Sequence, residues 1–398
     1  MFHRSLGFVV ALLLLSGQAF AETDAAKSGA NKSVPNSTRW SADKANAWYA
    51  QQRWLIGANY LPANAINQLE MWQADTFDPA QIDKELGWAA GLGMNTMRVF
   101  LHDKLWEQDA PGFKKRIDQF LTISARHGIK PLIVFFDSCW NPNPKLGKQP
   151  EPTPGVHNSG WVQSPGTQGL ADTANYPKLK AYVQDIMRTF ARDQRVLGWD
   201  LWNEPDNALG GGGMDSPEGK EKIRLVTALL PQVFAWARET DVSQPITSGV
   251  WLRDDWATQS KLMPIERTQL ENSDFITFHV YDWPEVLERK IKQLQTYGRP
   301  IVVTEYIARG AGSIFETSLP IGVKYNVGLI NWGFVVGKSQ TQFPWDSWQK
   351  PYVNNPPVVW HHDILHADGR PYRQAEVDQI RAVTAAAQAE FDQRQRKK

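Results

Sequence analysis

The sequence predicts an α/β protein whose single domain is a (β/α)8 barrel. Beyond about residue 50, short apolar segments alternate with longer amphipathic ones, a rhythm typical of parallel strands joined by crossover helices. The alternative, a doubly wound sheet, would be expected to show a glycine-rich phosphate turn after its first strand, and Gly57-Ala58-Asn59-Tyr60 is not such a turn. The eight strand candidates are residues 54–60, 96–101, 131–136, 196–202, 245–250, 275–280, 301–304 and 327–336.

Helical segments lie between most of these strands, and several carry start or stop signals. Asp78-Pro79 is typical of a helix beginning, and glycine after His127 and Tyr297 is typical of a helix end. The connection after the fifth strand is the least clearly helical. The helix candidates are residues 81–91, 113–127, 178–192, 218–240, 284–297, 313–325 and 373–393.

Two connections are too long to be simple turns, namely residues 137–176 after the third strand and 337–372 after the eighth. Both follow strands, so in a barrel both lie on the carboxyl-terminal face, where barrel proteins build their active sites. We expect these two loops to shape a cleft at that face.

The composition is that of a folded protein with a large core, since 42% of the 398 residues are hydrophobic and 21% are charged. Lys and Arg number 43 and Asp and Glu 42, so without Arg4 the two signs balance at 42 each. This balance argues against nucleic acid or an anionic membrane as partner. We expect a monomer that acts on an uncharged or small ligand.

The first 21 residues match a secretory signal peptide. A basic start at Arg4 precedes an apolar run at residues 6–15 and the cleavage pattern Ala19-Phe20-Ala21. The run is about half the length of a membrane span, and no cysteine follows the cleavage site to carry a lipid. We therefore expect a secreted or periplasmic protein without a membrane span, with a signal peptide (1–21), a flexible leader (22–38) and one barrel domain (39–398).

Two glutamates stand at the ends of predicted strands. Glu204 follows the fourth strand in Asn203-Glu204-Pro205, where proline cannot continue the ladder, and Glu305 ends the seventh strand. Two carboxyl groups at one face of a barrel are what hydrolysis of a glycosidic bond requires, one to protonate the leaving oxygen and one to attack or stabilise the sugar carbon. Asn203 supplies an amide that can hold a sugar hydroxyl. The alternatives are a chance turn at Glu204 and a scaffold ion pair at Glu305.

These motifs, in strand order, resemble clan A glycoside hydrolases and most closely glycoside hydrolase family 5, over about residues 50–390. The resemblance implies that Glu204 is the acid/base, that Glu305 is the nucleophile, and that the anomeric configuration is retained. It implies neither a metal nor an organic cofactor. A transglycosylase using the same residues, or a silent barrel that only binds glycans, remains an alternative.

Further residues match positions that the family uses. Arg98 is a charge inside an apolar strand, and near Glu305 it would keep that carboxylate ionised, although a structural salt bridge with another acid is the alternative. His279 and Tyr281 share one face of the sixth strand, where the family contacts the substrate and the nucleophile. Trp332, on the eighth strand, matches the family's tryptophan that stacks on a sugar ring.

Weaker candidates for substrate binding are Asn59, His102 and Asp137, polar residues after the first three strands that could equally cap loops. The single cysteine, Cys139, is expected to pack as a small apolar residue. Histidines at 361, 362 and 366 lie in an irregular segment without a strand-borne carboxylate, so we do not expect a metal site there.

Overall fold

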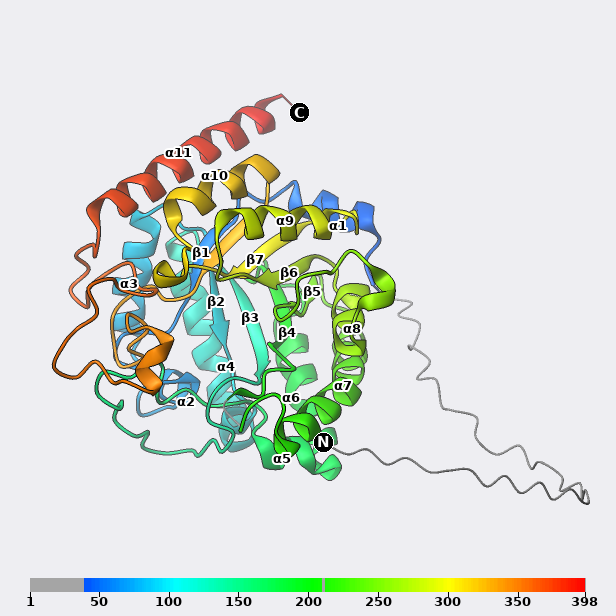
Figure 1. Cartoon of the computed structure of the whole chain (residues 1–398). Coiled ribbons are helices and arrows are strands. Elements are labelled where there is room, and N and C mark those ends of the chain that lie inside the picture. Colours follow the sequence, from blue (N-terminus) through cyan, green and yellow to red (C-terminus); the bar gives the residue numbers. More distant parts are fainter. Residues whose placement is uncertain (1–38, 210–211, 398) are drawn as a thin grey trace, which may run out of the picture. The chain divides into compact units, whose positions relative to one another are not determined.

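The protein, described by a computed structural model over residues 39–209 and 212–397, contains eight parallel strands within that part of the chain. The strands pair in the order β5-β4-β3-β2-β1-β8-β7-β6, and a parallel bridge between Val250 and Phe278 joins the two ends of the sheet. The predicted (β/α)8 barrel is therefore confirmed (Figure 1). The strands are β1 (Ile56–Asn59), β2 (Thr96–Phe100), β3 (Lys130–Asp137), β4 (Gly198–Asn203), β5 (Ile246–Thr247), β6 (Ile276–His279), β7 (Ile301–Glu305) and β8 (Gly328–Asn331).

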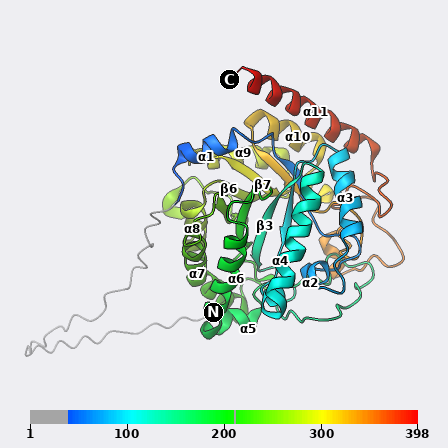
Figure 2. The same cartoon turned by 180° about the vertical axis from the view of Figure 1, so that it is seen from behind.

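A helix follows each strand and covers the outside of the barrel; from behind, α3, α4 and α6 lie outside the sheet (Figure 2). The connection after β5, hardest to interpret in the sequence, contains the helix α8. The helix α1 (Ala42–Tyr49) precedes β1. The crossover helices are α3 (Pro79–Gly91), α4 (Asp103–Arg126), α6 (Tyr176–Thr189), α7 (Pro217–Arg238), α8 (Pro264–Asn272), α9 (Pro284–Gln295), α10 (Phe315–Tyr325) and α11 (Gln374–Arg396), and the short helices are α2 (Gln68–Trp72) and α5 (Thr167–Ala171).

The interior of the barrel changes from apolar to polar along the strands. Near the amino-terminal ends a separate buried apolar cluster fills the barrel, and α1 contributes Tyr49 to it. Further along, Thr247 and Thr277 bond each other at 2.9 Å, and beyond them lie the buried groups of Arg98 and Asp200. The apolar end closes the barrel, so the polar chemistry is confined to the carboxyl-terminal face. The apolar cluster consists of Tyr49, Leu55, Leu132, Leu197, Phe275, Val302 and Ile330.

The largest differences from the predicted strands are at β5 and β8, which are both much shorter than expected. β5 stops at Thr247 because the next N–H, that of Ser248, donates to the hydroxyl of Ser273 and not to a neighbouring strand. β8 stops at Asn331, and Gly333 then turns the chain with a positive φ of 75°. Trp332, predicted on the eighth strand, therefore lies one residue beyond it.

The helix α4 begins earlier than its apolar pattern predicts, at Asp103 instead of residue 113. The side chain of His102 caps the new beginning by accepting the N–H of Lys104 at 3.2 Å. A kink at Asp109, two residues before Pro111, separates this first part from the predicted helix. The kink explains why the sequence pattern showed only the second part.

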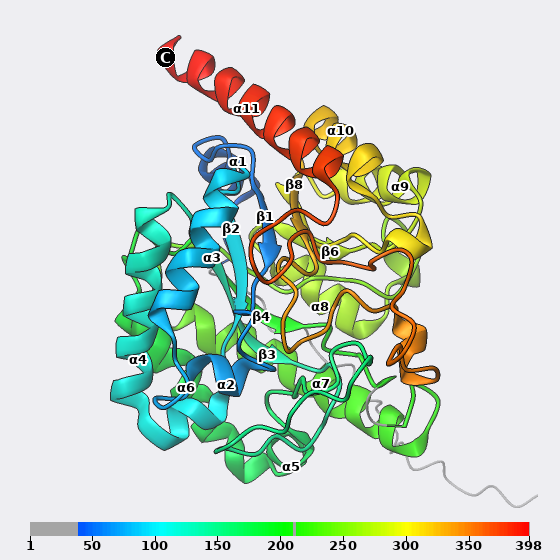
Figure 3. The same cartoon turned by 90° about the vertical axis from the view of Figure 1, so that its left-hand side faces the viewer.

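Two long segments cover the carboxyl-terminal face. We define loop 3 as residues 138–166, between β3 and α5, and loop 8 as residues 332–373, between β8 and α11. In Figure 3, loop 8, coloured orange to red, passes in front of the strands. A short 3-10 helix, η5 (Trp345–Trp348), lies within loop 8. Among the described residues, no helix is both long and apolar enough to cross a membrane.

Candidate active site

Glu204 leaves the end of β4 through an unusual backbone conformation. Its φ is 41°, in the left-handed region that non-glycine residues rarely adopt. Pro205 follows at the second position of a turn, which the N–H of Asn207 closes on the carbonyl oxygen of Glu204 at 2.8 Å. Such conformations cluster at functional sites, and here the turn directs one carboxyl group into the mouth of the barrel.

Glu305 is the last residue of β7, and its side chain is held at both oxygens. Oε1 accepts a hydrogen bond from the guanidinium of Arg98 at 2.9 Å, and Oε2 accepts one from the hydroxyl of Tyr281 at 2.6 Å. The side chain of Arg98 is 1% exposed, so solvent screens this ion pair little. The carboxylate is thus fixed in position and next to a permanent positive charge.

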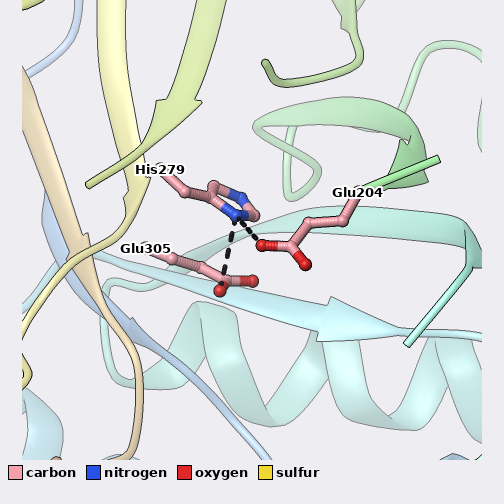
Figure 4. A group of neighbouring side chains, drawn as sticks. All are labelled: Glu204, His279 and Glu305. Carbon is pink, nitrogen blue, oxygen red and sulfur yellow. Dashed lines mark hydrogen bonds and ion pairs between the residues drawn. The ribbon is translucent and has the colours of Figure 1, made fainter. Parts of the chain in front are cut away.

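His279, at the end of β6, lies between the two glutamates (Figure 4). Its Nδ1 is 2.7 Å from Oε1 of Glu204 and 3.4 Å from Oε2 of Glu305. Burial lowers the pKa of the imidazole to about 4, so the ring is neutral at neutral pH, and the tautomer decides whether Nδ1 donates to the carboxyl groups or accepts from Glu204. The side-chain ligand atoms of these three residues lie within 4.8 Å of one another.

This group of two carboxyl groups and one imidazole offers donor types that metal ions accept. The oxygens of Glu305, however, already accept hydrogen bonds from Arg98 and Tyr281. The guanidinium of Arg98 lies 2.9 Å from this carboxylate and would repel a metal cation bound there. The arrangement therefore favours proton transfer and nucleophilic attack over metal binding.

Burial raises the pKa of both glutamates, but their neighbours differ. Glu305 pairs with Arg98, which stabilises its ionised form. Glu204 has no such pairing and is hydrogen bonded by neutral groups, the amide of Asn207 at 2.7 Å and the thiol of Cys139 at 3.3 Å. Only Glu305 has a direct ion pair with Arg98, so charge stabilises the ionised form of Glu305 more strongly than that of Glu204.

Arg98 satisfies both interpretations given to it from the sequence. It pairs with Glu305, and it also donates from Nε and Nη2 to Oδ2 of Asp200 at 3.0 and 2.8 Å. Burial lowers its pKa, but the charges of Asp200 and Glu305 raise it further than burial lowers it. Nη2 also donates to Asn203 at 2.8 Å, so one guanidinium ties β2 to the ends of β4 and β7.

Two of the other sequence-predicted residues have their polar atoms engaged in the scaffold. Asn59 donates to the carbonyl oxygens of Thr304 and Asn331 and accepts from Arg98 at 3.0 Å. Asp137 is 1% exposed and accepts from Asn203 at 3.1 Å and from Trp161 at 2.6 Å. These contacts position Arg98 and Asn203. His102 has its Nδ1 engaged as the cap of α4, where this atom also lies 3.1 Å from Oδ1 of Asp103.

Trp332 is half-buried and belongs to an aromatic group at the side of the mouth. Its ring meets Phe100 edge to face at 6.0 Å and Trp161, from loop 3, at 5.7 Å. This packing fixes the indole beside the end of β8.

Three contributors to the site were missed from the sequence: Asp200, Asn207 and Cys139. Asp200 could have been found from the sequence, because it is an acidic residue inside an apolar strand, just as Arg98 is a basic residue inside another. Cys139 does pack in an apolar cluster with Phe100 and Trp161, as expected, but it also touches Glu204. No pattern pointed to Asn207, because only the turn after Glu204 brings its amide back to that carboxyl group.

The fold is similar to those of several solved structures. The exo-beta-1,4-mannosidase Op5Man5 from Opitutaceae bacterium strain TAV5 matches with a TM-score of 0.54 and 19% identity, over 84% of this chain and 60% of that one. GH5_18 from Streptomyces cattleya, in a variant solved in complex with Manb1-4GlcNAc, matches with a TM-score of 0.55 and 13% identity, over 84% and 80%. The endo-1,4-beta-mannanase from Rhizomucor miehei matches with a TM-score of 0.54 and 13% identity, over 84% and 98%.

The chain thus spans 60% of the length of the first of these proteins. No protein-family model and no curated protein matches the chain in sequence. At identities of 13 to 19% the likeness is one of fold, and the resemblance to glycoside hydrolase family 5 is confirmed at that level.

Proposed function

We propose that the protein is a retaining β-glycoside hydrolase in which Glu204 is the acid/base and Glu305 the nucleophile. The observation that carries the proposal is the short separation of the two carboxyl groups, since one oxygen of Glu204 lies within 4.8 Å of one oxygen of Glu305. Retaining glycosidases place their carboxyl groups about 5 to 5.5 Å apart, whereas inverting enzymes need about 6.5 to 9.5 Å to admit a water molecule between them.

The two neighbourhoods support this division of roles. In the first step, protonated Glu204 gives its proton to the glycosidic oxygen while ionised Glu305 attacks the anomeric carbon, so that the leaving sugar departs and a glycosyl ester forms. In the second step, ionised Glu204 takes a proton from water, whose oxygen displaces Glu305 and releases the sugar. His279, Tyr281 and Arg98 keep the two carboxyl groups in place, and no step needs a metal or a cofactor.

The proposed substrate class rests on similarity of fold. The similar folds include proteins named for mannosidase and mannanase activity. Among the linkages considered from the sequence, those of glucans, mannans and xylans, we therefore propose the β-mannosidic one. Trp332 is the residue proposed to stack on the sugar, and Asn203 the one proposed to bond a hydroxyl.

A panel of 4-nitrophenyl β-D-mannoside, β-D-glucoside and β-D-xyloside tests the proposal. We expect the mannoside to be hydrolysed fastest and NMR of the early products to show the β-anomer of the free sugar. The α-anomer as first product would refute the retaining mechanism, and the absence of hydrolysis of every glycoside, polymers included, would refute the enzyme.

Export also stays a prediction, because residues 1–38 lie outside the described part of the chain. The supporting observation is the signal-peptide pattern that ends at Ala21. Intact mass spectrometry of the protein from its producing cells should show a chain beginning at Glu22, and an uncleaved chain in the cytoplasm would contradict the prediction.

A further inference from the structure

The two carboxyl groups define which side of the site holds which part of a substrate. In the proposed reaction, the sugar that is attacked lies against Glu305, and the leaving group extends past Glu204. Glu305 ends β7, and its neighbours in the sheet are β6 and β8, so the attacked sugar lies near Tyr281 and Trp332. The leaving group lies toward the segments that follow β4 and β5.

On the side of the attacked sugar, loop 3 and loop 8 are joined by seven hydrogen bonds. The N–H of Asn158 donates to Ser339 at 2.8 Å, and the N–H of Tyr352 donates to Gly155 at 2.9 Å. The side chain of Gln340 alone makes three of the bonds. Its oxygen accepts the N–H of Gly155 at 3.0 Å, and its nitrogen donates to the carbonyl oxygens of Thr153 and Val156 at 2.7 and 3.0 Å. The remaining two join His157 to Ser347 and Phe343, each at 2.9 Å.

The contact is close enough to depend on a glycine. Gly155 has a φ of 74°, and a Cβ there would lie 2.5 Å from the backbone of Tyr352. The two main chains therefore pack directly on each other, with no gap between the loops at that point for a sugar chain.

Aromatic rings extend this contact across the mouth of the barrel. Trp140 of loop 3 stacks on Trp348 of loop 8 with 5.0 Å between centroids and 10° between planes. His362 of loop 8 packs at 5.2 Å from His157 of loop 3 and at 5.6 Å from Tyr281, which bonds the nucleophile. The joined loops form a continuous structure from the end of β3 to the end of β6, which we call the loop wall.

Trp332 and Trp161 line a small cavity. This cavity of about 20 Å³ is lined by Asn59, Asn158, Trp161 and Trp332 among others. A water molecule needs roughly 10 to 15 Å³ on this measure, whereas sites for small molecules span about 300 to 1,000 Å³. The cavity can hold one water, to which the otherwise unpartnered amide of Asn158 can bond, but no second sugar.

The opposite side differs in character. Leu209, which follows β4, is 62% exposed, and Leu252, which follows β5, is 47% exposed. Neither residue belongs to the loop wall, and exposed apolar groups offer a surface for the apolar faces of sugar rings. A leaving group of several sugars can extend over this side.

From this asymmetry, and resting on the proposed function, we propose that the site is exo-acting and removes one sugar at a time from non-reducing chain ends. The loop wall stops the chain directly beyond the attacked sugar. An internal linkage cannot be placed between Glu204 and Glu305, because its chain would have to pass through the wall.

The test compares two β-1,4-mannohexaoses labelled at the reducing end with 2-aminobenzamide, one free and one blocked at its non-reducing end by a 4,6-O-benzylidene group. We expect the wild-type enzyme to shorten the free chain one sugar at a time. It should cleave the blocked chain more slowly by a factor of ~100 or more, because displacing the packed loops costs about 3 kcal/mol. Early release of labelled trimers or dimers from the blocked chain would overturn the proposal.

A double variant, Trp348→Ala with Gln340→Ala, opens the loop wall without touching either carboxyl group. It should raise the rate on the blocked chain relative to the free one by about 10-fold or more, whereas Trp283→Ala, an exposed tryptophan outside both loops, should leave that ratio unchanged. An unchanged ratio in the double variant would refute the role of the loop contacts. If the enzyme hydrolyses aryl glycosides but cuts the blocked chain at internal linkages, only this inference is refuted. If the enzyme hydrolyses no glycoside, the proposed function is refuted.

Discussion

Asn207 sets how strongly Glu204 holds its proton, and replacing it with alanine should move the alkaline side of the pH profile. The amide of Asn207 donates to Oε2 of Glu204 at 2.7 Å. This bond stabilises the ionised carboxylate, so it opposes the rise in pKa that burial causes. Asn207→Ala removes the donor, and the pKa of Glu204 should rise.

The magnitude follows from the strength of such a bond. Hydrogen bonds to charged groups contribute about 1.5 to 3 kcal/mol, and 1.36 kcal/mol corresponds to one pKa unit, so the pKa of Glu204 should rise by about 1 to 2. The acid must be protonated to act, and the pKa on the alkaline side of kcat/KM reports that of the free enzyme's acid. That pKa should therefore move upward, toward higher pH, by the same amount.

The assay is kcat/KM against pH for an alkyl mannoside, whose poor leaving group needs acid assistance. Asn46→Ala, at an exposed residue of α1, is the matched control and should reproduce the wild-type profile. An aryl mannoside with an activated leaving group should show the alkaline change only weakly. If Asn207→Ala leaves the alkaline pKa in place or lowers it, Glu204 is not the acid that this profile reports.

Three further predictions concern the carboxyl groups. Glu305→Ala should lower kcat by about 10⁴ to 10⁶-fold, and azide should restore reaction by forming the α-mannosyl azide. The exposed control Glu221→Ala should keep its activity. Wild-type-like activity of Glu305→Ala, or an equal loss in the control, would contradict the nucleophile assignment. Glu204→Gln should lower kcat/KM about 10² to 10⁴-fold on alkyl mannosides and much less on activated aryl mannosides, and equal losses on both would count against Glu204 as the acid. Burial raises the pKa of Asp363 from 3.8 to about 7. Between these two pH values the folded state keeps a proton that the unfolded state has lost, so the free energy of unfolding falls by up to about 4 kcal/mol as the pH rises from about 4 to 7. Asp363→Asn removes this loss, so the melting temperature of the variant relative to wild type should be higher at pH 8 than at pH 5, and an equal difference at both would refute the shift.

Much of the fold could be predicted because parallel strands are buried on both faces. β7, for example, is buried at every position, and its apolar run of residues 301–303 is followed by Thr304 and Glu305. The alternation of such runs with amphipathic segments was enough to number the strands and to place Glu204 and Glu305 at the same face. The ends of β5 and β8 were not predictable, because side-chain hydrogen bonds at Ser248 and a turn at Gly333 stop them.

The parts of the site that escaped prediction depend on contacts between distant segments. The amide of Asn207 reaches Glu204 only because the backbone at Glu204 adopts a positive φ, which no residue pattern announces. The pairing of Arg98 with Asp200 joins β2 to β4, and although each charge stood out in its apolar strand, their register relative to each other is a property of the barrel. The loop wall likewise needs two irregular segments to meet, and neither has a periodicity from which the meeting could be read.

The charges around Arg98 explain why one carboxyl group can serve as acid in the first step and as base in the second. In the resting state of the proposed mechanism, Asp200 and Glu305 are ionised beside the positive Arg98, His279 is neutral and Glu204 is protonated, which leaves one net negative charge among these buried groups. When Glu305 becomes a glycosyl ester, its charge disappears. Glu204 can then ionise while the group returns to its resting net charge of minus one, and the new carboxylate no longer faces the negative charge of Glu305. The covalent step itself therefore lowers the pKa of Glu204, and the carboxylate that must take a proton from water arises only once there is an ester to hydrolyse.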